Sequence, residues 1–376
     1  MPNFPFQRAK PLGWAANEKL TSAQINQIDA NAAQAADGTV WTDATALRTW
    51  SPIVTTSQVA LSILYSAFTD VWYAFAVSAG NPSVFTRLGA AGLWTAGALS
   101  AGNPAAGVGF TPRKRAVAAD PVQKIVVIGG LPGSSSNQKY RRLNENTMAW
   151  TTPVSSQTST ASVDCLAWVP ALGLFVAGLS DGKVETSPDG VTWTLRTTPN
   201  ANARTSIAVG PINGASGGIV MGSSVATNTL IHSVDGINWT QRTLSPGFPS
   251  SEIVVYVPLL GQYSVMNNGG GGLNTSPDGV TWTSRAIALP IALATGLGVI
   301  QNSFAAFGRT IMLAAYAPSL GLDAIIYSQD GGLTWRLSAA FATTTSSIGP
   351  LASNGYQTQY CVAFSSGIVS SIAGGF

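Results

Sequence analysis

The sequence predicts an all-β fold, a seven-bladed β-propeller preceded by a short N-terminal arm and helix. Three observations lead to this prediction. A pattern of the form Ser-x-Asp-Gly-x-x-Trp recurs along the chain. Its copies are separated by about the length of one propeller blade. The intervals contain short β-branched or small apolar runs bounded by Gly, Pro, Asn or Ser, which is typical of antiparallel meanders.

The recurring pattern has four strong copies and three weaker ones. The strong copies consist of Ser187, Asp189 and Trp193; Ser233, Asp235 and Trp239; Ser276, Asp278 and Trp282; and Ser328, Asp330 and Trp335, the last with one inserted Gly. The weaker copies end in the same way, at Asp37–Trp41, Leu88–Trp94 and Asn146–Trp150. Successive Trp residues are roughly 43 to 56 positions apart.

The chemistry of the pattern explains why it recurs. Asp-Gly between two strands favours a tight hairpin, because Gly accepts a positive φ and the Asp carboxylate can accept backbone N–H groups. The Trp that follows lies early on the outer strand, where its ring can cover the hairpin and fill the gap beside the next blade. We therefore interpret the Ser, Asp and Trp of each copy as structural residues.

The ends of the chain predict how the ring closes. After Trp335 the runs Ser346–Leu351, Tyr360–Phe364 and Gly367–Ile372 provide three strands, and Thr39–Thr42 near the N-terminus provides a fourth. Joining them divides residues 37–376 into seven blades of about 49 residues each. A six-bladed ring with an irregular N-terminal part is the alternative, because the copies before residue 140 are degenerate.

Residues 1–36 differ in kind and predict an anchoring arm and helix. Prolines alternate with aromatic residues up to Trp14, which suggests an extended segment. Thr21 and Gln24 then have the spacing of a helix N-terminus, and Ile25 and Ile28 lie on one face of the helix. This face either packs on the chain's own propeller or anchors the chain to another subunit, so Trp14, Ile25 and Ile28 are candidate anchoring residues.

The repeated pattern resembles the Asp box, or bacterial neuraminidase repeat, of sialidase-type and related β-propellers. The resemblance extends from about residue 37 to the end of the chain. It implies the propeller fold strongly and an activity only weakly, because such propellers include sialidases, other glycosidases, assembly factors and binding modules.

The stretch from Gly13 to Asn26 resembles the N-terminal part of tail-fibre and other virion proteins of tailed bacteriophages. The resemblance is confined to the N-terminal part of the chain. It implies a homo-oligomeric virion protein that contacts other virion subunits through its arm and presents the propeller to a host surface polysaccharide or receptor. The start of the chain has no apolar core of a signal peptide, which agrees with synthesis in the host cytoplasm.

Composition excludes several other classes. Charged residues make up 9% of the chain and the net charge is +3, so we expect no general grip on nucleic acid. No apolar run is long enough to span a bilayer, which predicts no membrane insertion. Cys165 and Cys361 have neither zinc spacing nor a disulfide framework, and we predict two buried free thiols, no metal and no cofactor.

We predict no catalytic residues. The Arg-Ile-Pro tripeptide expected of a sialidase is missing from the sequence, and one carboxylate pair, Asp164 and Glu252, is left for a glycosidase of another type. The lone His232 is interpreted as a surface or hairpin side chain. A sialidase-like glycoside hydrolase and a cellular scaffold or assembly propeller are therefore kept as alternatives to a virion attachment protein.

Basic residues are unevenly distributed. Five that lie close together in sequence are candidates for binding an acidic partner, or else form ordinary solvated surface: Arg113, Lys114, Arg115, Arg141 and Arg142. Arg196, Arg242 and Arg285 each follow a repeat Trp by three positions. They are expected to protect exposed edges of the outermost strands.

Overall fold

The computed structural model describes most of the chain that follows the predicted arm and helix. The described residues are 50–55, 59–78, 81–88, 95–96, 111–132, 138–151, 160–223, 228–244, 253–266, 272–287, 298–317, 322–342, 348–353, 360–364 and 368–372. All of them belong to one compact unit, Leu47–Phe376. The sequence predictions for Trp14, Ile25, Ile28, Asp37–Trp41 and Trp94 lie outside the described residues.

The described residues form an almost entirely β structure built from short antiparallel meanders. The N-terminal half contains β1 (Trp50–Thr55), β2 (Val59–Ser66), β3 (Val71–Ser78), β4 (Asn81–Leu88), β5 (Thr95–Ala96), β6 (Thr111–Asp120), β7 (Ile125–Leu131), β8 (Tyr140–Asn144), β9 (Ala149–Thr151), β10 (Val163–Val169), β11 (Leu174–Leu179), β12 (Val184–Ser187) and β13 (Thr194–Arg196). The C-terminal half contains β14 (Arg204–Val209), β15 (Ile219–Ser223), β16 (Thr229–Ser233), β17 (Thr240–Thr243), β18 (Ile253–Val257), the 3-10 helix η2 (Pro258–Leu260), β19 (Gln262–Met266), β20 (Leu273–Ser276), β21 (Thr283–Arg285), β22 (Gly298–Phe307), β23 (Thr310–Ala317), β24 (Leu322–Ser328), β25 (Arg336–Ala342), β26 (Ile348–Ser353), β27 (Tyr360–Phe364) and β28 (Ile368–Ile372).

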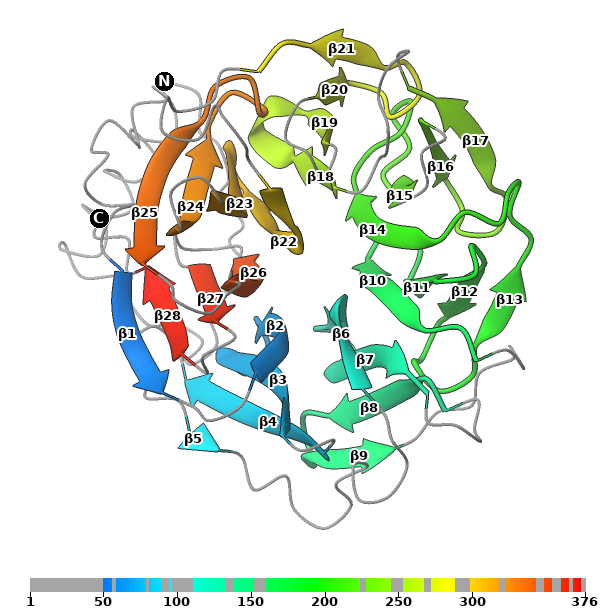
Figure 1. Ribbon diagram of the computed structural model, residues 1–376. Coiled ribbons are helices and arrows are strands. Elements are labelled where there is room, and N and C mark those ends of the chain that lie inside the picture. The colour runs from blue at the N-terminus through cyan, green and yellow to red at the C-terminus, as the bar shows by residue number, and fades with distance from the viewer. Residues whose placement is uncertain are drawn as a thin grey trace, which may run out of the picture. The chain divides into compact units, whose positions relative to one another are not determined.

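Hydrogen bonding groups these strands into propeller-like sheets. Among the described residues, β2–β5, β14–β17, β18–β21 and β22–β25 are four-stranded sheets in chain order. The meanders β6–β9 and β10–β13 share one eight-stranded sheet, joined by a single parallel pairing of Arg115 with Cys165. The first strands β2, β6, β10, β14, β18, β22 and β26 contact one another in this order, and β26 contacts β2. These first strands are innermost in Figure 1.

The last sheet joins the two ends of the described chain. Strand β1 pairs antiparallel with β28, and the sheet continues through β27 to β26. A strand from the N-terminal part of the described chain thus completes the C-terminal sheet. The paired strand is Trp50–Thr55, whereas the predicted Thr39–Thr42 lies outside the described residues.

The four strong copies of the repeat form one kind of turn between the third and fourth strands of a meander, here called the Ser–Asp turn. The Ser187 hydroxyl donates to the Asp189 carboxylate at 3.1 Å and accepts the amide hydrogen of Gly190 at 2.9 Å. The carboxylate also accepts the amides of Val191 and Thr192 at 2.8 and 3.2 Å. The same hydroxyl–carboxylate bond, at 2.9, 2.9 and 2.8 Å, occurs in the turns beginning at Ser233, Ser276 and Ser328.

These hydrogen bonds keep the turn carboxylates ionised. Burial acts to raise the pKa of each carboxyl, but bonds from backbone amides and from the Ser hydroxyl outweigh it. The pKa of Asp235 and of Asp278 falls to about 2. The pKa of Asp189 and that of Asp330 are also lowered. In this charge-poor chain, four ionised carboxylates are therefore occupied by hydrogen bonds from the backbone N–H groups of their own turns.

The glycine of the Ser–Asp turn provides a matched pair for a stability test. Gly190 and Gly236 have left-handed backbones, with φ of 68° and 72°. A Cβ at Gly190 would lie 2.6 Å from Cγ2 of Val127, whereas a Cβ at Gly236 would approach Leu174 only to 3.4 Å. We expect Gly236→Ala to cost about 1 kcal/mol of unfolding free energy, from backbone strain alone. Gly190→Ala should cost about 2 to 3 kcal/mol because the stiff Val side chain must move as well. Equal losses in urea unfolding would contradict the steric part.

The repeat Trp residues pack between consecutive meanders, against the preceding meander and not beside the next one as expected from the sequence. Trp193 is 1% exposed and stacks on Tyr140 of the preceding meander, with ring centroids 3.8 Å apart and planes 2° from parallel. Trp150 meets Phe75 edge to face at 6.4 Å. Each remaining described repeat Trp joins an apolar cluster that contains residues of two meanders, namely Trp239, Trp282 and Trp335. The core is thus a series of seams between neighbouring meanders.

Candidate functional site

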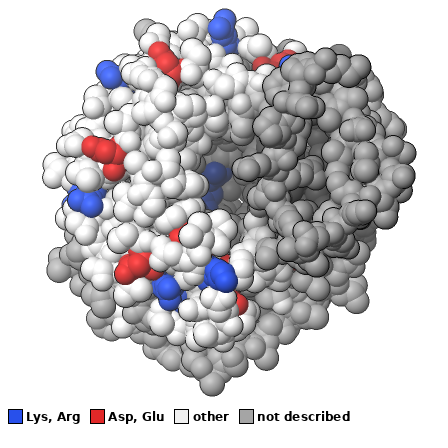
Figure 2. Space-filling view, turned by 180° about the vertical axis from the view of Figure 1, so that it is seen from behind, with Lys and Arg blue, Asp and Glu red and all other residues white. Residues whose placement is uncertain are grey.

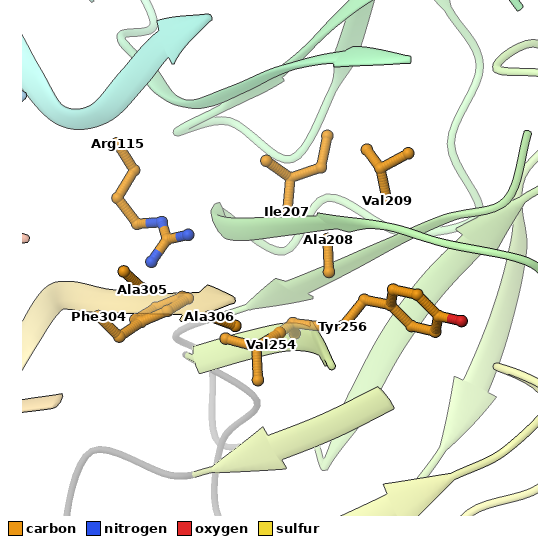
Figure 3. A pocket seen from close by; sticks show the side chains of 10 residues that line it. Arg115, Ile207, Ala208, Val209, Val254, Tyr256, Phe304, Ala305 and Ala306 are labelled. Carbon is orange, nitrogen blue, oxygen red and sulfur yellow. The ribbon is translucent and has the colours of Figure 1, made fainter. Parts of the chain in front are cut away.

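A pocket lies among the innermost strands, where β6, β14, β18 and β22 face one another. It has a volume of ≈ 180 Å³. Its lining comprises Arg115, Ile207, Ala208, Val209, Val254, Val255, Tyr256, Phe304, Ala305 and Ala306. Figure 3 shows these side chains, and Figure 2 shows a central hollow with a basic side chain inside it. We call this feature the axial pocket.

Arg115 supplies the charge of the axial pocket. Its guanidinium carbon lies 3.2 Å from the ring centroid of Phe304, a cation–π contact that reaches from β6 to β22. Its Nη1 is buried and has no hydrogen-bond partner among the described residues. Burial lowers the pKa of Arg115 to about 9, so the group is still protonated at neutral pH. The pocket therefore combines mostly apolar side chains with one half-buried cation, of which Nη1 is out of solvent.

The carboxylate of Asp164 forms an ion pair with Arg113 and not with Arg115. Asp164 Oδ1 lies 3.6 Å from Nε of the exposed Arg113 and accepts a hydrogen bond from Ser162 at 2.6 Å. Burial raises the pKa of Asp164, although Ser162 and Arg113 oppose the shift. Glu252, the other half of the carboxylate pair considered from the sequence, lies outside the described residues.

The five basic candidates for partner binding have different environments. Arg113 is exposed, and Arg115 lines the axial pocket. Arg141 is 1% exposed, and its Nη1 donates to the backbone carbonyls of Gln138 and Tyr140 at 3.0 and 2.8 Å. Arg142 donates to the carbonyl of Asp189 at 3.0 Å. The side chain of Lys114 is outside the described residues, and the four others do not share one exposed surface.

Buried polar groups cross the seam beside Arg141. Tyr140 donates its hydroxyl to Glu185 Oε2 at 2.6 Å, and both residues are fully buried. Lys139 is also fully buried, and burial lowers its pKa although the charge of Glu185 opposes this. Of the two cysteines, Cys165 is a buried free thiol as predicted, and burial raises its pKa to about 12. Some of the basic residues that lie close together in sequence are thus buried in the protein interior and do not form a binding surface.

His232 is buried rather than exposed, which corrects the interpretation of the sequence. It is 8% exposed on β16, and its Nε2 accepts a hydrogen bond from Arg242 Nε at 3.0 Å. The equivalent arginines of two other meanders, Arg196 and Arg285, donate to a Thr hydroxyl at 2.8 and 3.3 Å. The three outer-strand arginines are therefore tied to the third strand of their own meander.

This arrangement predicts a pH dependence of stability. Burial and the positive charge of Arg242 lower the pKa of His232 below its ordinary value of about 6.5. The unfolded chain then binds the proton more readily, so stability is complete above about pH 6.5 and falls as the pH drops toward the folded-state pKa. We expect His232→Thr, which copies the other two meanders, to reduce the loss of Tm between pH 7 and 5. Identical pH profiles of both proteins would contradict this.

The sequence did not point to most residues of the axial pocket. Phe304, Tyr256 and Ile207 belong to no motif, and they are separated from Arg115 by about 90 to 190 positions. Only Arg115 had been singled out, and for a surface role. The signal that could have found the others is their position on the first strand of each meander.

Two further features concern the described residues alone. Among them, no group of three or more His, Cys, Asp or Glu side chains could hold a metal ion. In the same part of the chain, no helix has the length and apolar character needed to cross a membrane.

Comparison with known proteins identifies the fold. No family model and no curated protein matches the sequence. Among solved structures, YCF48 from Cyanidioschyzon merolae is similar with a TM-score of 0.60 and 15% identity, over 86% of this chain and 98% of that one. Virginiamycin B lyase from Staphylococcus aureus, an inactive variant with quinupristin, has a TM-score of 0.62 and 10% identity over 86% and 97%. The Myceliophteria thermophila Cps50 (Swd1) β-propeller domain has a TM-score of 0.57 and 9% identity, over 86% of this chain and 99% of that one. The chain has a β-propeller fold.

Proposed function

We propose that this protein is a non-catalytic attachment propeller of a tailed-bacteriophage virion. Residues 1–36 would anchor it to other virion subunits, and residues 37–376 would form the propeller that meets a host surface polysaccharide or receptor. In this proposal the protein is a homo-oligomer, made in the host cytoplasm and located in the virion, as a tail fibre, tail tip or capsid decoration.

The proposed architecture is a seven-bladed propeller of Asp-box type. It treats the eight-stranded sheet as two blades, because β6–β9 and β10–β13 are complete meanders joined by one pairing. The hydrogen bonds of the Ser–Asp turns support the assignment of their Ser, Asp and Trp residues as Asp-box positions.

The observation that carries the binding role is how few free charges the described part of the propeller presents. Its turn carboxylates are occupied by backbone amides, and its outer-strand arginines are hydrogen-bonded within their meanders. Figure 2 accordingly shows a face on which charged side chains are few and scattered. A neutral polar surface with loops on a rigid scaffold suits contacts with uncharged sugars and with other subunits. The resemblance of Gly13–Asn26 to phage virion proteins supports the placement on a particle.

Binding to the host surface tests this proposal. Purified protein, with its oligomeric state measured, would be applied to cells of the host and to the isolated surface polysaccharide. We expect saturable binding without release of reducing sugar, and labelling of the particle by antibody in electron microscopy. Turnover of the polysaccharide would support the glycosidase alternative instead. Absence from the particle would refute the virion placement.

A cellular assembly propeller is a second candidate because of one comparison. YCF48 bound to D1 peptide matches with a TM-score of 0.60 and 16% identity over 86% of this chain and 94% of that one. That neighbour binds a peptide on the same kind of scaffold. For this chain, recovery in a cellular complex with a peptide or protein partner, in place of a particle, would favour the assembly role.

A further inference from the structure

We infer that the axial pocket is a binding site for a compact apolar monocarboxylate, with Arg115 as its anion-binding residue. This goes beyond the proposed attachment to a host surface, which involves the outer loops. The two can fail independently, because the axial site is tested with small acids and needs no host cell.

The state of Arg115 is the first step of the argument. Its Nη1 is buried without a partner among the described residues, and Phe304 offers it only a ring face. Among the described residues, the one charge influence on its pKa comes from the Cys165 thiol, and burial keeps that thiol neutral. Arg115 is only half-buried as a residue, but its Nη1 lies out of solvent with a bond unmade, which costs free energy that packing does not return. A bound anion that accepts a hydrogen bond from Nη1 of Arg115 would account for this arrangement.

The walls of the pocket define the rest of the ligand. Apart from Arg115, only Tyr256 among the lining residues has a polar side-chain atom, and Figure 3 shows its hydroxyl pointing away from Arg115. A sugar hydroxyl would therefore find no side-chain partner besides Arg115 in this part of the lining, and each hydroxyl left unpaired costs about 1 to 3 kcal/mol. Aliphatic or aromatic carbon suits Ile207, Val254 and Phe304 much better.

The charge and size of the pocket limit the class of acid that can bind. One guanidinium fork matches one carboxylate in a bidentate pair. A phosphate dianion would leave a second charge facing apolar walls. The volume of ≈ 180 Å³ accommodates a short branched acid rather than a lipid chain. The ligand class is thus a small hydrophobic acid, either free or as the C-terminal residue of a peptide.

Matched probes test the site. Isothermal titration would compare 4-methylpentanoate with 4-methylpentanamide, which has the same shape without the charge. We expect the acid to bind at least about tenfold more tightly than the amide, because only the acid pairs with Arg115. Glucuronate and inorganic phosphate should bind more weakly than 4-methylpentanoate. Equal binding of acid and amide, or tighter binding of glucuronate or phosphate, would overturn the assignment.

Variants separate binding from structure. Arg115→Met should abolish carboxylate binding while Tm stays unchanged or rises, because a buried Nη1 that has no partner among the described residues is removed. Arg115→Lys, which keeps the charge and loses the fork, should bind with intermediate affinity. Arg285→Met, at an exposed arginine of an outermost strand, is the control and should bind as the parent does. Unchanged binding by Arg115→Met would refute the site, and a fall of its Tm would indicate that the arginine is structural.

A second pair of probes identifies the source of the acid. N-acetylglycyl-leucine presents the same branched carbon chain and carboxylate at the end of a peptide. Binding tighter than that of 4-methylpentanoate would support the site as a receptor for peptide C-termini, and weaker binding would support it as a site for free acids. Absence of binding by both would overturn the proposal.

Discussion

Replacing Glu145 with Ala is expected to lower the free energy of unfolding by about 4 kcal/mol. Glu145 is 5% exposed and directly follows β8. Its carboxylate accepts hydrogen bonds from Ser66 at 2.9 Å and from Thr69 and Tyr73, each at 3.0 Å. Hydrogen bonds to a charged group contribute about 1.5 to 3 kcal/mol each, and the Ala variant leaves three hydroxyls without their acceptor.

This carboxylate joins two sheets at a point where they meet. Ser66 ends β2, Thr69 lies in the following turn and Tyr73 lies on β3, whereas Glu145 belongs to the β6–β9 meander. Burial and the charge of Glu145 raise the pKa of Tyr73 above its ordinary range, so its hydroxyl remains a donor at any pH of interest. The loss should therefore appear as separation of the two meanders.

Two variants sharpen the test of this junction. Glu145→Gln keeps an acceptor oxygen and should cost about 1 to 2 kcal/mol. Asp70→Asn changes an exposed carboxylate that accepts the Tyr65 hydroxyl at 2.7 Å, and it should cost less than about 1 kcal/mol. Urea unfolding followed by Trp fluorescence gives all three values. A loss below about 1 kcal/mol for Glu145→Ala would show that water replaces the carboxylate at this seam.

The fold could be predicted from the sequence to the extent that local chemistry determines it. The Ser–Asp turns lie within a few residues of sequence, and the hydrogen bonds of Asp189 are those that an Asp-Gly hairpin favours. The strand Trp50–Thr55 contains no such motif. It pairs with Ile368–Ile372, more than 300 positions away, so only the closed fold identifies it.

The candidate site could not be predicted because it depends on contacts between distant strands. Arg115 and Phe304 lie on β6 and β22, and no spacing along the chain signals that they meet. Arg141 looked like a surface base because it stands beside Arg142, yet Arg141 is buried and only Arg142 is partly exposed. His232 occupies a position held by Thr in two other meanders, and its burial follows from the sheet rather than from its neighbours in sequence.

The other large effect is expected at the seam filled by Trp193. Truncating Trp193 to Ala should cost about 4 kcal/mol, because a buried Trp leaves a large cavity. It would also remove the partner that stacks on Tyr140, whose hydroxyl bonds to buried Glu185 at 2.6 Å. Trp193→Phe, which keeps an aromatic ring, should lose about 2 kcal/mol.

Trp239 is the matched control for this prediction, because it has the same place in the repeat but is half-buried. Trp239→Ala should cost about 2 kcal/mol, roughly half the loss at Trp193. Thermal unfolding followed by circular dichroism would measure both. Equal losses would mean that the Trp of each copy contributes through its own turn. A larger loss at Trp193 would show that its contribution to stability comes from the contact with the preceding meander. Identical sequence motifs would then contribute different free energies of unfolding, because they face different residues.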